Sequence, residues 1–179
     1  MDLRECIRRD RATRAYTDDS VSRETIEELL DVARRAGSGK NRQPWSFLVV
    51  RDPDRLETLA SFGRYTTPLE RAPVGIVLLV ENRGDERPLS QDIFDCGRAF
   101  QNLKLAATEA GLGSVPQAVD TEEAGEFLEV PDGKTILIVL AVGHPAEPDD
   151  TIEGEPKADV LEDTGRRPLE ELVHWETHR

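Results

Sequence analysis

The sequence predicts an α+β fold, in which helices pack around one central sheet. Two segments, residues 74–80 ("VGIVLLV") and 135–143 ("TILIVLAVG"), are almost continuously apolar, as is typical of strands buried on both faces. The longest helical pattern of the chain, residues 90–110, lies between them. Helices and strands alternate without regular strand–helix–strand units, and this favours α+β over a parallel doubly wound sheet.

The N-terminal part of the chain predicts two helices and a strand. Asp2 and Ser22 are placed as N-caps, each before the apolar spacing of a helix. The second helix is expected to bury one face, formed by Ile26, Leu29, Leu30, Ala33 and Ala36. Gly37 and Gly39 are expected to end it, and residues 46–50 ("SFLVV") predict the strand that follows.

The middle of the chain predicts helices separated by loops. A short helix is expected at residues 56–60, and Pro68 and Pro73 mark the following segment as a loop. A second loop is expected at residues 82–89. The helix at residues 90–110 has a wide apolar band that includes small residues. We therefore expect it to be central and to face a second copy of the chain.

The segment after the long helix, residues 111–119 ("GLGSVPQAV"), is expected to form a tight loop. Asp120 and Glu123 then have the spacing of a capping box for a helix that ends near Leu128.

The overall composition is strongly acidic. Asp and Glu number 36 against 23 Lys and Arg, which gives a net charge of −13. Such a surface repels nucleic acids and anionic membranes, so neither is expected as a partner. Lysine occurs only at Lys40, Lys104, Lys134 and Lys157, a scarcity that suggests adaptation to high salt.

No apolar run is long enough to span a membrane, and the N-terminus lacks an apolar signal core, so a cytoplasmic protein is expected. The chain beyond residue 147 is acidic and rich in Pro and Gly, a composition that does not form a core. We expect a single domain over residues 1–179, with an extended C-terminal arm at about 147–179.

The residues most often used in metal and nucleophilic sites form no motif. Cys6 and Cys96 have neither metal nor redox spacing and are interpreted as reduced, structural thiols. His174 and His178 have helical spacing without a third ligand, so no metal site is expected. "GSG" at residues 37–39 lacks the pattern of a nucleophile elbow, and "GLGSVP" at 111–116 lacks the preceding strand and third glycine of a dinucleotide fingerprint.

Four separated segments carry residues that together suit an anionic cofactor with a flat heteroaromatic ring. They contain Arg11 and Arg14; Ser38, Asn41 and Gln43; the glycines of residues 111–119; and Arg166 and Arg167. Arginines grip phosphate through paired hydrogen bonds, amides both donate and accept at a ring edge, and glycine lets the backbone approach a ligand. Each segment also has a simpler explanation, as charge balance, a helix end or a turn.

These segments occur in an order typical of one protein family. They read "RATRAY", "SGKNRQPW", "QNLKLAATEAGLGSVP", and the endings "AVGHPAE" and "RRPLEELVHW". The second contains S-x-x-N-x-Q-P-W, a fairly specific pattern. Over nearly its whole length the chain therefore resembles the nitroreductase family of FMN-dependent oxidoreductases.

The resemblance implies a mostly antiparallel sheet flanked by helices and an intertwined homodimer with FMN at the interface. The phosphate end of the cofactor site would be formed by Arg11, Ala12, Thr13 and Arg14, joined by Arg166 or Arg167. Arg11 and Arg14 would bind the phosphate itself.

The resemblance also implies which residues contact the rest of the cofactor. Ser38, Asn41 and Gln43 would line the ribityl chain and the ring. The N5 and O4 edge would be lined by Pro116, Gln117, Ala118 and Val119, and the backbone N–H of Ala118 would bond N5.

The activity implied is ping-pong transfer of hydride from NAD(P)H through flavin N5 to a nitroaromatic, a quinone or an activated alkene. The cofactor does the chemistry, so no side chain is assigned a catalytic role. The sequence chooses neither among the acceptors nor between NADH and NADPH.

Three positions depart from the family pattern: Asp10 stands where Arg is usual, Ala12 replaces a common Ser, and Gly37 replaces a common Pro. An Asp beside a phosphate would repel it by about 1 kcal/mol or more. Alternatively, Asp10 points away and orients Arg11 or Arg14.

Three other interpretations stay open. The first is a flavin-binding protein without catalysis, and the second is a relative that breaks down flavin or removes halogen. Such relatives carry a lid over the ring, for which the segment between Phe62 and Pro73 is short. The third is an interaction module without flavin.

Overall fold

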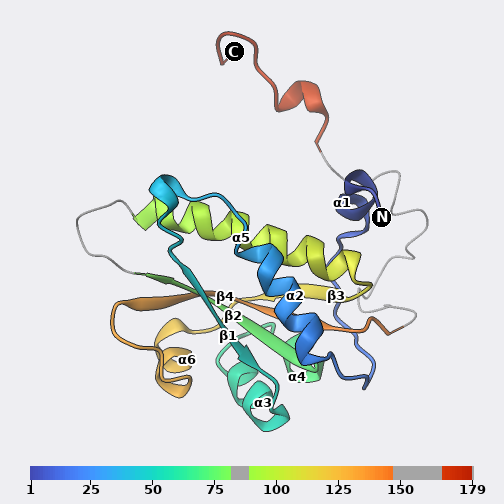
Figure 1. The fold of residues 1–179 in the computed structure, drawn as a ribbon, viewed down its shortest axis with the longest axis vertical. Helices are drawn as coiled ribbons and strands as arrows, with labels where there is room; N and C mark the ends of the chain where they lie inside the picture. The colour runs from blue at the N-terminus through green and yellow to red at the C-terminus, as the bar shows by residue number, and fades with distance from the viewer. Residues whose placement is uncertain (82–88, 147–166, 179) are drawn as a thin grey trace.

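The computed structural model describes residues 1–81, 89–146 and 167–178. Its strands form one sheet in the order β1-β2-β4-β3, and every neighbouring pair is antiparallel (Figure 1). The strands are β1 (Trp45–Val50), β2 (Val74–Glu81), β3 (Gly113–Gln117) and β4 (Lys134–Gly143). The predicted α+β fold with a mostly antiparallel sheet is confirmed.

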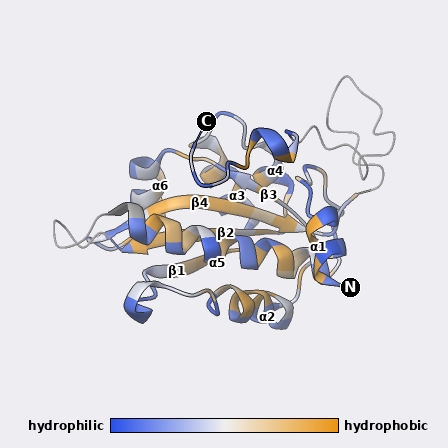
Figure 2. Cartoon of the chain, turned by 90° about the horizontal axis from the view of Figure 1, so that it is seen from above, coloured by the Kyte–Doolittle hydropathy of each residue, from blue (hydrophilic) through white to orange (hydrophobic). Residues whose placement is uncertain are grey.

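Helices cover both faces of this sheet (Figures 1 and 2). One face carries α2 (Arg23–Ala33) and α5 (Leu89–Glu109), and the other carries α3 (Pro53–Ser61), α4 (Thr67–Arg71) and α6 (Thr121–Phe127). Side chains alternate along a strand, so Ile76 of β2 packs under α2 and α5 while Val77 packs against α3, α4 and α6. The central strand β2 is buried on both faces, as predicted.

The expected tight loop at residues 111–119 is wrong in part, because residues 113–117 form β3. Gly113 pairs with Gly143, and Pro116 pairs with Leu140 of β4. A proline usually argues against a strand because it lacks the N–H that a ladder needs. Since β3 lies at the edge of the sheet, Pro116 is tolerated there.

Two helix predictions also need correction. The segment between Pro68 and Pro73 was expected to be a loop, but it contains α4, with Pro68 in its first turn, where a missing N–H costs nothing. The second helix ends earlier than the apolar spacing suggests. Its α-helical part stops at Ala33, and Ala36 follows in a tighter turn, with its N–H donating to the Ala33 carbonyl at 3.2 Å.

The first helix, α1 (Leu3–Arg9), packs on α5 at the N-terminal end of the chain. Asp2 caps it by accepting from Glu5 N–H at 2.9 Å, and the thiol of Cys6 donates to the Leu105 carbonyl at 3.3 Å. The chain then runs from α1 directly into the arginine segment.

The expected C-terminal arm lies mostly at residues 147–166, which are outside the described residues. Residues 167–178 are exposed throughout and contain a short 3-10 turn, η3 (Leu169–Glu171). No helix in the described ranges combines the length and the apolar character that crossing a bilayer requires.

Candidate cofactor site

The arginine segment runs as an extended strip along β3. Ala12 forms a parallel bridge with Ser114, and Thr13 N–H donates to the Ser114 carbonyl at 3.1 Å. Further along, Thr17 N–H donates to the His144 carbonyl at 2.9 Å. The structure therefore brings Arg11–Arg14 next to the β3 segment, as two parts of one site require.

Close packing fixes the separation between this strip and β3. A Cβ atom added at Gly113 would lie 2.5 Å from Oγ1 and Cγ2 of Thr13, so no larger residue fits without displacing the strip. The Tyr16 hydroxyl donates to the Thr13 carbonyl at 2.7 Å and also lies 3.3 Å from the Ala141 carbonyl. Thr13 itself is buried, whereas Arg11 and Arg14 on either side of it are half-buried.

The carboxylate of Asp10 is turned toward α5. Lys104 Nζ lies 3.0 Å from its Oδ1 and donates to its Oδ2 at 3.1 Å, and Gln101 Nε2 donates to Oδ2 at 3.1 Å. Arg11 bonds only the backbone of this residue, with a guanidinium N–H 3.0 Å from the Asp10 carbonyl. The side-chain carboxylate of Asp10 thus pairs with α5. The backbone carbonyl of the same residue accepts a hydrogen bond from the Arg11 side chain.

The end of β3 presents alternating exposed and buried residues. Pro116 and Ala118 are exposed, Val119 is half-buried, and Gln117 is 5% exposed. Gln117 Nε2 donates to the Pro116 carbonyl at 2.7 Å, but its Oε1 has no hydrogen-bond partner among the described residues. A buried acceptor without a partner is uncommon, and here it lies in the segment assigned to the ring edge.

The loop from Ser38 to Gln43 is strained and mostly exposed. Lys40, Asn41 and Gln43 have φ values of 55°, 54° and 50°, a left-handed backbone that non-glycine residues seldom adopt. Ser38 Oγ accepts from Gln43 N–H at 2.9 Å and closes the loop. Asn41 and Gln43 are exposed, so their side chains are accessible from outside this chain.

This loop and the arginine strip meet α5 at different places. Gly39 N–H donates to Asp95 Oδ2 at 2.9 Å, whereas Asp10 pairs with Lys104. Nine residues of α-helix span about 14 Å at 1.5 Å per residue. One chain therefore presents two separate groups, and the structure does not bring Ser38, Asn41 and Gln43 onto Arg11 and Arg14.

Of the two C-terminal arginines Arg166 and Arg167, only Arg167 is among the described residues, and it is not brought to either group. Arg166 lies outside the described residues. Arg167 is exposed and pairs with Glu171 at 3.2 Å within its own segment.

Sequence reasoning missed two residues of α5 that hold these segments, Asp95 and Lys104. Asp92 and Asp95 are buried at positions that continue the core-facing stripe of Ala99 and Leu103. Charged residues in such a stripe are a signal that each has a partner. For Lys104 the sequence carried no comparable signal.

Neither cysteine is placed as a nucleophile. Burial, and then the charges of Asp92, Asp95 and Glu81, raise the pKa of Cys96 to about 12. Burial also raises the pKa of Cys6. Among the described residues no cluster of three His, Cys, Asp or Glu side chains could hold a metal ion.

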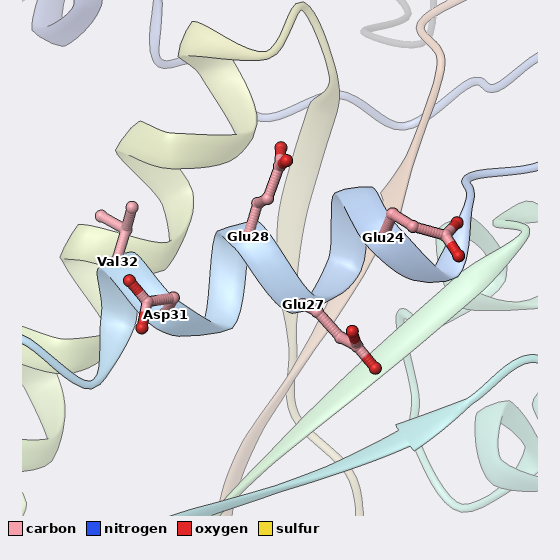
Figure 3. A pocket seen from close by; sticks show the side chains of 5 residues that line it. All are labelled: Glu24, Glu27, Glu28, Asp31 and Val32. Carbon is pink, nitrogen blue, oxygen red and sulfur yellow. The ribbon is translucent and has the colours of Figure 1, made fainter.

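A hollow of about 560 Å³ beside α2 is lined by carboxylates (Figure 3). Glu24, Glu27, Glu28 and Asp31 line it together with Val32. In Figure 3 the carboxylates point away from one another rather than toward a common centre. Glu27 pairs with Arg23. Asp31 pairs with Arg34 and Arg35, so these carboxylates do not form a ligand site.

Comparisons with known proteins agree with this arrangement. The model of the nitroreductase family matches residues 7–64 and 63–144. A provisionally named NADH dehydrogenase/NAD(P)H nitroreductase of Archaeoglobus fulgidus is 30% identical over 163 residues, covering 87% of this chain and 94% of the relative. An FMN reductase of Bacillus subtilis, named for NAD(P)H, is 27% identical over 157 residues, covering 76% of this chain and 63% of the relative.

A solved structure is similar over the full length. A provisionally named nitroreductase of Desulfovibrio desulfuricans, in complex with FMN, is 31% identical with a TM-score of 0.78, covering 100% of this chain and 99% of the other. The family model spans most of the sequence, and both the sheet and the motif order agree with it. The chain belongs to the nitroreductase family.

Proposed function

We propose that the protein is an FMN-dependent NAD(P)H oxidoreductase. The observation that carries this proposal is the strip Arg11–Arg14, held by backbone bonds against β3. Two arginines thus lie beside a strand whose last residues include Gln117, a buried acceptor with no hydrogen-bond partner within the described ranges. The relatives named for FMN and NAD(P)H support the same cofactor and donor.

The residues present fit FMN. Arg11 and Arg14 would hold the phosphate, because guanidinium groups bind phosphate oxygens through paired hydrogen bonds. Pro116 and Ala118, both exposed at the end of β3, would lie along the ring edge, with Ala118 N–H bonding N5. Gln117 Oε1 would gain a donor from the ligand or from ordered water. Arg166 or Arg167 would reach the phosphate from the C-terminal segment.

When bound, FMN supplies the redox chemistry, by ping-pong hydride transfer from NAD(P)H to a small acceptor of the nitroaromatic, quinone or activated-alkene type. The chain binds and orients the reactants. A backbone N–H at the ring edge favours negative charge there, as a fixed dipole in a site that excludes water does. No side chain is assigned a proton-transfer role.

A second copy of the chain would complete the site. The Ser38–Gln43 loop meets α5 about 14 Å along the helix axis from the arginine strip, and its exposed Asn41 and Gln43 are available to a neighbour. Beside the loop contact at Asp95, α5 exposes Ile93 (42%), Phe94 (68%) and Gly97 on its outer face. We propose that two copies pack through this face, intertwined by their C-terminal segments, with FMN between them.

The first test is an absorbance spectrum of the purified protein, followed by NADH and then NADPH without oxygen. A yellow protein that bleaches would support the proposal and identify the donor. Restoration of the colour by a nitroaromatic, a quinone or an activated alkene would identify the acceptor class. A colourless protein that takes up no added FMN would refute it.

The acidic residue at position 10 motivates one alternative, a protein that binds flavin without catalysis, although the Asp10 carboxylate pairs with Lys104. That alternative predicts a yellow protein that neither donor bleaches.

We also propose a cytoplasmic protein adapted to high salt. The excess of 36 Asp and Glu over 23 Lys and Arg supports this, because like charges repel one another and salt screens the repulsion. Thermal unfolding with and without molar salt tests it. A Tm that rises with salt supports the proposal, and an unchanged Tm refutes it.

A further inference from the structure

We infer that Lys104 is the positioning residue that makes an acidic side chain at position 10 compatible with a phosphate site. The inference rests on the proposed binding of FMN. It assigns to Lys104 a role through Asp10, without contact between Lys104 and the cofactor.

The ion pair is largely shielded from water. The side chains of Lys104 and Asp10 are 15% and 9% exposed, so neither charge is well solvated. Asp10 Oδ2 accepts hydrogen bonds from Lys104 and Gln101, whereas the buried Oδ1 has no hydrogen bond among the described residues. Oδ1 is therefore stabilised chiefly by the ammonium group 3.0 Å away.

The pair also links α5 to the arginine strip. Asp10 ends α1 by donating its N–H to the Cys6 carbonyl at 3.0 Å, and its own carbonyl accepts from the Arg11 guanidinium at 3.0 Å. One residue thus connects Lys104 on one side with Arg11 on the other. Fixing the Asp10 carboxylate on α5 fixes the carbonyl group that orients Arg11.

Without Lys104 the strip would change in two ways. A buried carboxylate would lose its counter-charge and would repel an incoming phosphate, since charges in a poorly solvated site interact strongly. Asp10 would also be released toward solvent or toward Arg11, and either movement removes Arg11 from its present position. Both effects weaken the binding of the phosphate and leave the ring edge at β3 unchanged.

The test compares FMN with riboflavin, which lacks the phosphate. Dissociation constants are measured by flavin fluorescence on the apoprotein at low and at molar salt, for wild type, Lys104→Met, Asp10→Asn, the double variant and Lys104→Arg. We expect Lys104→Met to weaken FMN binding by about tenfold at low salt, with riboflavin unaffected and the loss smaller at molar salt. Lys104→Arg should bind FMN as wild type does.

The double variant distinguishes the proposed role from direct contact. If Lys104 acts only through Asp10, the double variant and Asp10→Asn bind FMN equally. A loss in the double variant relative to Asp10→Asn would overturn the inference, because Lys104 would then act on the phosphate itself. This comparison holds even if Lys104→Met alone does not fold.

The remaining outcomes separate this inference from the proposed function. A wild-type apoprotein that binds neither flavin refutes the proposed function. A wild type that binds FMN, with every variant equal to it, refutes the role of Lys104 and leaves the function standing. Equal losses for FMN and riboflavin would show a general structural role and would also overturn the inference.

Discussion

The backbone N–H of Gly39 donates to Oδ2 of Asp95 at 2.9 Å, and this bond ties the Ser38–Gln43 loop to α5. The loop contains three non-glycine residues with positive φ. Each left-handed residue costs about 1 kcal/mol, so the surrounding structure has to hold the loop in place. Asp95, whose side chain is 6% exposed, is one of the groups that do so.

We therefore expect Asp95→Ala to release the loop. A hydrogen bond to a charged group contributes about 1.5–3 kcal/mol, so the free energy of unfolding should fall by up to that amount, and FMN affinity should fall with it. Asp95→Asn keeps an acceptor oxygen and serves as the matched control. Urea unfolding and FMN titration measure the two effects. The loop assignment would be contradicted by an Ala variant that binds FMN as tightly as the Asn variant.

A methyl group at Gly113 should displace the arginine strip. Because the added Cβ would meet Thr13 at 2.5 Å, Gly113→Ala is expected to destabilise the fold by about 1–3 kcal/mol and to weaken FMN binding. Gly125→Ala in α6 is the control, since nothing lies within 4 Å of its added Cβ and alanine favours a helix by up to about 1 kcal/mol. Thermal melts and FMN titrations of both variants check this prediction, and equal melts would contradict it.

A charged residue introduced on the outer face of α5 tests whether this face is the dimer interface. Phe94 is 68% exposed there, and Phe94→Arg should shift the mass of the protein from dimer toward monomer. Bound FMN should be lost together with the dimer, because each FMN site is proposed to need both copies of the chain. Tyr65→Arg is the control, at a residue that is 82% exposed between α3 and α4. Light scattering with an absorbance spectrum gives both readouts, and a Phe94 variant that remains a yellow dimer would contradict the proposed interface.

Cys96 should make stability depend on alkaline pH. Its thiol pKa is raised from 9.0 to about 12 in the fold, so between these values the unfolded chain loses the proton while the native chain keeps it. The unfolded state then binds fewer protons, and the contribution of the thiol to stability falls as pH rises above 9. The unfolding free energy of the wild type minus that of Cys96→Ala should become smaller between pH 8 and pH 10. A constant difference would contradict the raised pKa.

Local sequence signals were sufficient for most elements and failed where tertiary contacts decide. The caps at Asp2 and Ser22 and the apolar run of β2 act locally, and the structure has each of them. Strand β3 depends instead on pairing with β4 across the sheet, which no pattern in "GLGSVPQAV" reveals.

The candidate site shows the same division. The motif order indicated which segments take part, and backbone bonds between Thr13 and Ser114 place two of them together. The partners on α5 were not predictable from the sequence. Asp10 meets Lys104 only because α1 packs across that helix, and Gly39 meets Asp95 through a contact 56 residues apart in sequence.

The strip that carries the arginines also protects the edge of the sheet. Strand β3 is an outer strand, and an outer strand with free backbone groups invites pairing with other chains. Ala12 and Thr13 occupy that edge at Ser114, and Pro116 offers no N–H farther along. Detachment of the strip would therefore expose this edge and permit aggregation. The segment proposed to bind the cofactor also protects the chain against aggregation through β3.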